Sequence, residues 1–244
     1  MRNLLLITTL IILTASCRQT GYLKYKGKTD EIIATNKIKK FMKDNESPSI
    51  VLRVPKSEQN ATQEDPNAYI YNSIEKELVL AGFDVKDRGL FNEVVSKSEE
   101  TNYKELKKLT ETDLILELVQ MKFNIKHKTN KFYTKRGKEK IASRDASITK
   151  TGAVIEFKLI ILEKNDYGGS YSFYYTPCNG SEEHKADCKC KIAHKGSKIY
   201  PEIDLCKTRK KKKKEAFEII DKDLLEEFVR KGVKQMVEET KAKV

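Results

Sequence analysis

The sequence predicts an α/β protein in which helices flank a mixed β-sheet, with a Cys-rich basic insertion and an amphipathic C-terminal helix. Three observations support this class. Runs rich in β-branched residues alternate with segments whose apolar residues recur at helical spacing. Four of the five cysteines gather in the 29 residues from Cys178 to Cys206. The last twenty or so residues carry one continuous apolar stripe, as expected of an amphipathic helix.

The N-terminus has the pattern of an export signal. Arg2 precedes the short apolar run 4–13, the small residues Ala15 and Ser16 follow, and Cys17 comes next. Such a run is too short to span a bilayer comfortably and is typical of a signal peptide. Small residues directly before a cysteine resemble a bacterial lipobox, although Thr14 stands where the usual pattern has Leu. We therefore predict a signal peptide over residues 1–16 and lipid attachment, including palmitate, at Cys17. The alternative is ordinary secretion with a chance cysteine near the cleavage site.

The first half of the chain after the signal gives several elements in order. Residues 17–30 are polar and predict a tether, and residues 31–244 predict a single domain. Asp65 is a good N-cap, Pro66 suits the first helical position, and Gly82 suits the position just past a helix. Asn102 followed by Glu105 resembles a capping box. We expect helices over 31–43, 66–81, 90–98 and from 102 onward, and strands over 49–54, 83–86 and 113–125.

The second half contains the insertion and the last helix. Residues 126–150 are strongly basic and poor in apolar side chains. Strands are expected over 153–162 and 170–175, joined by a turn at 165–169. The Cys-rich insertion follows at about 176–214, and the final helix is expected over 221–240.

Composition limits the partners. The chain is 34% charged but 39% hydrophobic, which is enough for a real core, and its net charge is +12. This excess favours anionic partners such as lipid head groups, envelope glycopolymers or acidic protein faces. Nucleic acid would be the first expectation for a cytosolic protein, and the export signal argues against it here.

The clustered cysteines predict disulfides. An exported chain with Cys178, Cys188, Cys190 and Cys206 is expected to form two bonds that staple a loop without its own core. A bond between Cys188 and Cys190 would require a strained tight loop, so each is expected to pair outward. Zinc is the alternative, because His184 and His194 lie nearby, but the spacing does not match common zinc modules. We expect no metal and no cofactor.

One charge run stands out from the rest of the insertion. In the run 207–214, seven of the eight residues are basic. We predict that they contact an anionic surface beside the lipid, and each contributes on the order of 1 kcal/mol to the binding free energy. The alternative is a solvated loop. The basic residues are Lys207, Arg209, Lys210, Lys211, Lys212, Lys213 and Lys214.

The segment 68–119 resembles a known group of envelope domains. Leu78, Gly82, Phe83, Val85 and Arg88 match the pattern L-x-x-x-G-F-x-V-x-x-R, and an aspartate precedes the strand that begins at Leu114. This pattern is similar to the domain shared by the curli secretion channel family (CsgG-like), the penicillin-binding-protein activators (LpoB-like) and the N-terminal domain of TolB. The resemblance covers about a quarter of the chain and implies architecture more than function. Residues 126–150 are too lysine-rich for a lipid-facing strand, which argues against the secretion-channel role. For Arg88 we favour an ion pair, with Asp87 or Glu93, over an anion contact.

Catalytic patterns are not evident. His127, His184 and His194 stand in no triad-like or metalloprotease context. We therefore expect a non-catalytic lipoprotein of the bacterial cell envelope, anchored at the outer membrane and exported to the periplasm, that docks a protein partner as an accessory or assembly factor. The alternatives are a subunit of a homo-oligomeric secretion or pore complex, and an envelope hydrolase.

Overall fold

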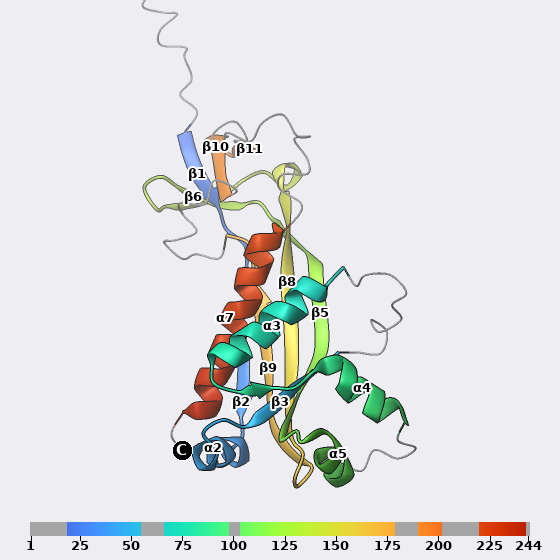
Figure 1. The fold of residues 1–244 in the computed structure, drawn as a ribbon. Helices are drawn as coiled ribbons and strands as arrows, with labels where there is room; N and C mark the ends of the chain where they lie inside the picture. Colours follow the sequence, from blue (N-terminus) through green and yellow to red (C-terminus); the bar gives the residue numbers. More distant parts are fainter. Residues whose placement is uncertain (1–18, 55–65, 98–102, 179–189, 202–219, 243–244) are drawn as a thin grey trace, which may run out of the picture. The chain divides into compact units, whose positions relative to one another are not determined.

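The chain folds into two compact units, each assembled from separate stretches of sequence. We describe it from a computed structural model, in which residues 19–54, 66–97, 103–178, 190–201 and 220–242 are described (Figure 1). Unit 1 comprises 1–27, 126–151 and 176–219, and unit 2 comprises 28–125, 152–175 and 220–244. The predicted α/β class is confirmed. The prediction of a single domain over 31–244 is wrong, because residues before 31 and around 126–151 complete a second unit with its own core.

Unit 2 is built on a mixed six-stranded sheet with the strand order β2-β9-β8-β5-β3-β4. β3 pairs in parallel with β4 and β5, whereas β9 pairs antiparallel with β2 and β8. The strands are β2 (Glu31–Ala34), β3 (Ser49–Arg53), β4 (Asp84–Val85), β5 (Leu114–Thr129), β8 (Ile148–Ile161) and β9 (Asp166–Tyr175). All five predicted strands are present, and β5 and β8 extend beyond the predicted bounds into residues of unit 1.

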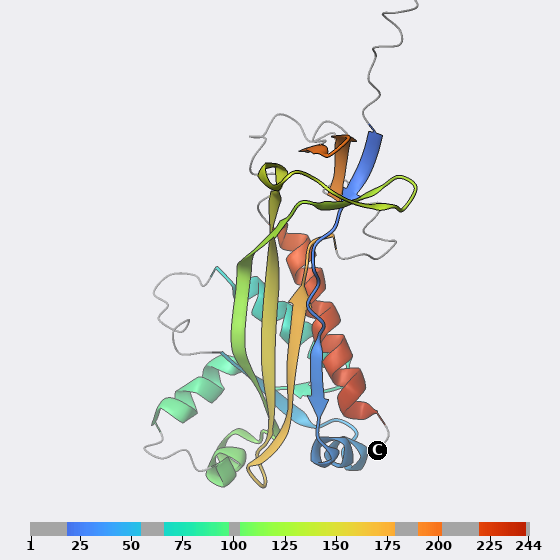
Figure 2. The ribbon, with the colours of Figure 1, turned by 180° about the vertical axis from the view of Figure 1, so that it is seen from behind.

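Helices pack on both faces of this sheet. Those described are α2 (Asn36–Asp44), α3 (Ala68–Leu80), α4 (Arg88–Lys97), α5 (Tyr103–Thr110) and α7 (Lys222–Lys241). The larger core, with 25 buried residues, joins α2, α3 and α7 to one face. A smaller cluster joins α4 and α5 to the other face, where Phe91 and Leu106 pack near Val51 and Ile115. Seen from behind, α3 and α7 lie beyond the sheet, and much of the near face carries no described helix (Figure 2).

The end of α3 and the stripe of α7 follow the sequence signals, whereas α2, α3 and α4 begin at other residues than predicted, and the predicted capping residue Asn102 lies outside the described residues. Gly82 adopts φ +88°, a conformation that costs glycine little, and the Phe83 N–H donates to the Leu78 carbonyl at 3.1 Å. α7 confirms the predicted amphipathic helix, since Leu225, Val229 and Val233 are buried along one side. The helix predicted from Pro66 begins at Ala68, after Asn67, whose side chain makes no capping hydrogen bond; the predicted N-cap Asp65 lies outside the described residues. The expected helix 31–43 is split, because residues 31–34 pair with β9 and Thr35 caps the helix that follows.

Unit 1 is a small antiparallel sheet with the strand order β11-β10-β1-β6-β7. The strands are β1 (Gln19–Leu23), β6 (Lys131–Thr134), β7 (Glu139–Ile141), β10 (Lys191–Lys195) and β11 (Lys198–Pro201). Its core contains eight buried residues, among them Leu23, Tyr25, Phe132 and Ile192. These strands were not predicted, because short polar runs such as 131–134 gain their stability from partners distant in sequence.

The predicted tether over 17–30 is wrong for its described part. Residues 19–23 form β1, the central strand of unit 1, and Leu23 and Tyr25 are 2% and 3% exposed. β1 pairs with β10 on one side and β6 on the other, with Gly21 opposite Ile192 and Thr134. A backbone paired on both sides cannot serve as a tether, so β1 fixes the N-terminal region within unit 1.

Candidate functional site

Many of the predicted site residues lie outside the described part of the chain. These are Cys17, Cys188, Cys206 and the basic run Lys207–Lys214. The predictions of lipid attachment, of the second disulfide and of anionic contact by the run therefore remain predictions. The described site residues are Cys178 and Cys190.

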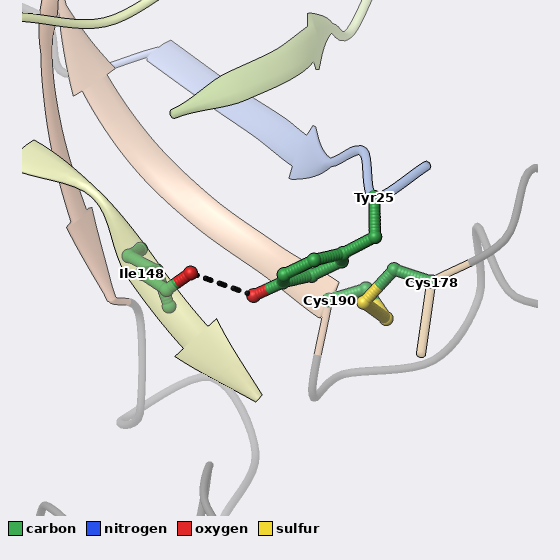
Figure 3. The surroundings of a disulfide bond; sticks show 4 residues. All are labelled: Tyr25, Ile148, Cys178 and Cys190. Carbon is green, nitrogen blue, oxygen red and sulfur yellow. Dashed lines mark hydrogen bonds between the residues drawn. A yellow bond between two sulfur atoms is a disulfide. The ribbon is translucent and has the colours of Figure 1, made fainter. Parts of the chain in front are cut away.

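Cys178 and Cys190 are joined by a disulfide within the core of unit 1 (Figure 3). The bond links residues 12 apart in sequence, at the start of the insertion and just before β10. Cys190 therefore pairs outward, as predicted. Two sulfurs bonded to each other are not available as thiolate ligands, so zinc bound by this pair is excluded. Among the described residues no group of three or more His, Cys, Asp and Glu side chains is arranged to hold a metal ion.

Tyr25 lies beside this disulfide and ties β1 to a second part of unit 1. Its hydroxyl donates a hydrogen bond to the Ile148 carbonyl at 3.2 Å (Figure 3). Burial raises the pKa of Tyr25 well above its usual value of 10.0, so the phenol stays protonated as a donor. Tyr25 and the disulfide together close the apolar side of the small sheet.

His194 is buried on the same apolar side. It is 1% exposed, its ring centroid is 4.8 Å from that of Phe132, and neither ring nitrogen has a hydrogen-bond partner within the described structure. Burial lowers the pKa of His194, and the positive charge of Lys140 lowers it further. His194 therefore packs against Phe132 on the apolar side of the small sheet, where burial favours its neutral form.

Charge is distributed very unequally between the two units. The described residues of unit 1 include fourteen Lys or Arg but only two acidic residues, Glu139 and Asp145. The described residues of unit 2 include 21 basic and 22 acidic residues. The basic residues of unit 1 are Lys24, Lys26, Lys126, Lys128, Lys131, Lys135, Arg136, Lys138, Lys140, Arg144, Lys150, Lys191, Lys195 and Lys198. A large positive excess is therefore already present in the described part of unit 1, apart from the run 207–214.

Part of this charge lies on one face of the unit 1 sheet, which we call the Lys–Tyr face. The strand registers place Tyr22 between Lys191 and Tyr133, and place Lys195 opposite Lys198. Cross-strand partners project to the same side of a sheet, and this side is opposite to Leu23, Phe132 and Ile192. Its lysines and tyrosines are Tyr22, Lys24, Lys131, Tyr133, Lys191, Lys195, Lys198 and Tyr200. The same registers also place Thr20, Glu139, Ile141 and Ala193 on this side.

Unit 2 contains a charged pocket of about 280 Å³ lined by residues of α2, by Lys107 and Asp113 before β5, and by the turn between β8 and β9. Most of its charges are paired: Lys37 with Asp166 at 2.5 Å, and Lys107 with Asp113 at 3.2 Å and Glu163 at 3.8 Å. Such partly exposed pairs contribute little to binding or stability by themselves. The pocket is therefore a weaker candidate than the Lys–Tyr face.

The residues that carry the family resemblance have structural roles. Asp113 accepts hydrogen bonds from Ser49 N–H at 3.0 Å and from Ser49 Oγ at 2.8 Å, which joins the starts of β3 and β5. Burial raises the pKa of Asp113, but the Ser49 and Lys107 contacts outweigh it, so the net pKa is lowered. Arg88 forms an ion pair, as favoured, but with Glu75 of α3 at 3.8 Å instead of Asp87 or Glu93. Its guanidinium also lies 4.8 Å from the ring centre of Tyr71.

Comparison with known proteins adds no relative. No protein-family model matches the chain, and no curated protein matches it.

The Lys–Tyr face was missed by our reasoning from sequence, although a signal for it exists. Lysine and tyrosine alternate with apolar residues in 22–24 and 131–133, which is the period of a strand with one polar face.

Proposed function

We propose that this protein is an exported, lipid-anchored component of the bacterial cell envelope that docks a protein partner and catalyses no reaction. The signal pattern of residues 1–17 carries the proposal. The disulfide between Cys178 and Cys190 supports it, because stable disulfides are typical of exported proteins. In the described part of the chain no helix is long and apolar enough to cross a membrane. The proposed attachment is the lipid on Cys17. The outer membrane is the proposed location, and the resemblance to envelope lipoprotein domains supports it.

Lipid attachment is tested by replacing the cysteine. In cells grown with labelled palmitate, Cys17→Ala should abolish labelling and either release the protein from membranes or leave the signal uncleaved. Multiple acyl chains are needed for stable anchoring, so the loss should be complete and not partial. Cys188→Ala is the matched control, since it removes a different cysteine. A Cys17→Ala protein that is still labelled and still fractionates with membranes would overturn the proposal.

A docking surface for the partner is offered by the uncovered part of the unit 2 sheet, which we call the open face. It lies opposite to the α3–α7 core and contains Glu31, Ile33, Val119, Glu156, Lys158, Ser170, Ser172 and Tyr174 (Figure 2). Ile33 and Val119 are 58% and 53% exposed. These two side chains give a partner apolar positions to contact among the polar ones.

Site-specific crosslinking tests this surface. A photo-reactive side chain at Ile33 or Val119 should give one shared adduct in intact envelopes. The same group at Lys234, an exposed position on α7, should not give it. Adducts at Lys234 without adducts at the open face would place docking elsewhere. A ladder of adducts between copies of this chain would favour the oligomeric complex instead.

A further inference from the structure

We propose that the Lys–Tyr face of unit 1 binds an anionic phospholipid surface. The proposal is distinct from the predicted role of the run Lys207–Lys214, because it concerns a folded sheet whose geometry is defined. It rests on the proposed lipid attachment only for the choice of partner. The binding itself can be measured without the lipid.

The charge on this face is largely uncompensated. Glu139 pairs with Lys24 at 2.6 Å and with Lys131 at 3.8 Å. By contrast, Lys191, Lys195 and Lys198 form no ion pair with any other described residue, and Lys195 and Lys198 are exposed. The only other acidic residue in the described part of unit 1 is Asp145. Such a surface attracts a negatively charged partner and repels a positive one.

Tyrosines lie between these lysines. Tyr22 and Tyr133 are cross-strand partners, and the Lys24 ammonium lies 4.7 Å from the centre of the Tyr133 ring. Tyr200 is 37% exposed on β11, beyond β10. Tyrosine combines an apolar ring with a polar hydroxyl, and it is enriched where proteins meet the head-group layer of a membrane. Lysines with interspersed tyrosines therefore fit a lipid surface better than an acidic protein face, which would need matching acidic positions.

The position of Cys17 selects the membrane among anionic partners. Gln19, the first residue of β1, follows Cys17 by two residues, and an extended chain covers at most about 7 Å over two residues. A lipid on Cys17 would thus hold the central strand of unit 1 at the bilayer surface. A lysine close to an anionic leaflet increases partitioning by about fivefold, so several lysines act together.

Vesicle co-sedimentation of the unlipidated mature chain, residues 18–244, tests the proposal. The probes are vesicles of phosphatidylcholine alone and vesicles of phosphatidylcholine with about 30% phosphatidylglycerol. We expect binding only to the anionic vesicles, with a decline as salt shortens the screening length. The triple variant Lys191→Gln, Lys195→Gln, Lys198→Gln should lower partitioning by about tenfold to a hundredfold.

Matched variants make the result specific. Lys43, Lys108 and Lys234 are exposed lysines of unit 2, and their replacement by Gln removes the same net charge. This control should lose less than about twofold, because these positions lie outside the proposed contact. If the triple variant does not fold, the pair Lys195→Gln and Lys198→Gln, which flanks the turn at Gly196, provides the same comparison.

Several outcomes would overturn the proposal. Equal losses in the two triple variants would show that only net charge matters. Binding that ignores lipid charge, or that depends on Lys210–Lys214 and not on β10 and β11, would also contradict it. Tighter binding to polyuridylate or dextran sulfate than to anionic vesicles at the same salt would assign the face to a soluble polyanion. Failure of the Cys17→Ala test alone would reject the anchor and leave the vesicle result standing.

Discussion

The two units of this chain are stabilised in different ways: unit 2 by a large apolar core, and unit 1 by a small core and a disulfide. Unit 2 buries 25 residues in one core between its helices and one face of its sheet. Among the described residues, the apolar core of unit 1 has eight members, two of which form the Cys178–Cys190 disulfide. A small core supplies little net stability, and a covalent link compensates by restricting the unfolded chain. The unit with less apolar burial also carries nearly all of the excess positive charge, which opposes its own folding.

The excess positive charge and the smaller apolar core occur in the same unit. Unit 2 is nearly neutral and depends on packing, so it is expected to be insensitive to reducing agents and to mild acid. Unit 1 depends on a disulfide, on a buried histidine and on Tyr25. The following experiments test this division, beginning with the largest expected effect.

Removal of the disulfide should unfold unit 1 selectively. Cys178→Ser with Cys190→Ser is expected to cost about 2–4 kcal/mol, because closing a loop of this size contributes roughly that amount. Hydrogen exchange measured on peptides should show lost protection in β1 and β10, and unchanged protection in residues 153–161 of β8. Equal loss in both units would show that they unfold together and would end the comparison.

Gly232→Ala should destabilise unit 2 through packing. A Cβ at this position of α7 would lie 2.9 Å from Cδ2 of Phe173, a residue that is 1% exposed and has no room to move. Overpacking of this kind costs about 1–3 kcal/mol, which exceeds the gain of about 1 kcal/mol from alanine in a helix. Denaturant unfolding measures the balance. Phe173→Leu should partly rescue the variant, and a more stable Gly232→Ala protein would contradict the argument.

Acid should weaken unit 1 through His194. Burial lowers the pKa of the folded state below the usual 6.5, so below that pH the unfolded chain binds a proton that the folded unit does not. The stability of unit 1 is therefore fully present above pH 6.5 and is lost as pH falls toward the folded pKa. Unit 2 contains no histidine, which confines the effect to unit 1.

The loss of unit 1 stability in acid is the smallest of the expected effects. It is measured by denaturant unfolding at pH 7.5 and pH 5.5, with hydrogen exchange in β1 and β10 as the readout. The comparison is with His194→Leu, in which the titrating group is removed. His127, whose pKa burial also lowers, is retained in both proteins, so the difference between them isolates His194. An identical acid response in the two proteins would assign the sensitivity to other groups.

Much of unit 2 could be predicted from sequence because its signals are local. The strand 49–53, the glycine that ends α3 and the stripe of α7 each follow from neighbouring residues. The Cys190 pairing direction also followed from a local argument, since a bond to Cys188 would span one residue. The ion pair of Arg88 did not follow from a local argument, because its partner Glu75 lies in the preceding helix, thirteen positions earlier in the sequence.

The sequence by itself determined the α/β class, the export pattern, the glycine that ends α3, the amphipathic C-terminal helix and the positive excess. Only the tertiary structure decided that residues 19–23 form a central strand, that there are two units, and that lysines and tyrosines share one sheet face. The physical reason is that Tyr22 pairs with Tyr133 and Lys191, more than a hundred residues away. A short polar strand gains its stability from such distant partners, and local propensity contains no record of them.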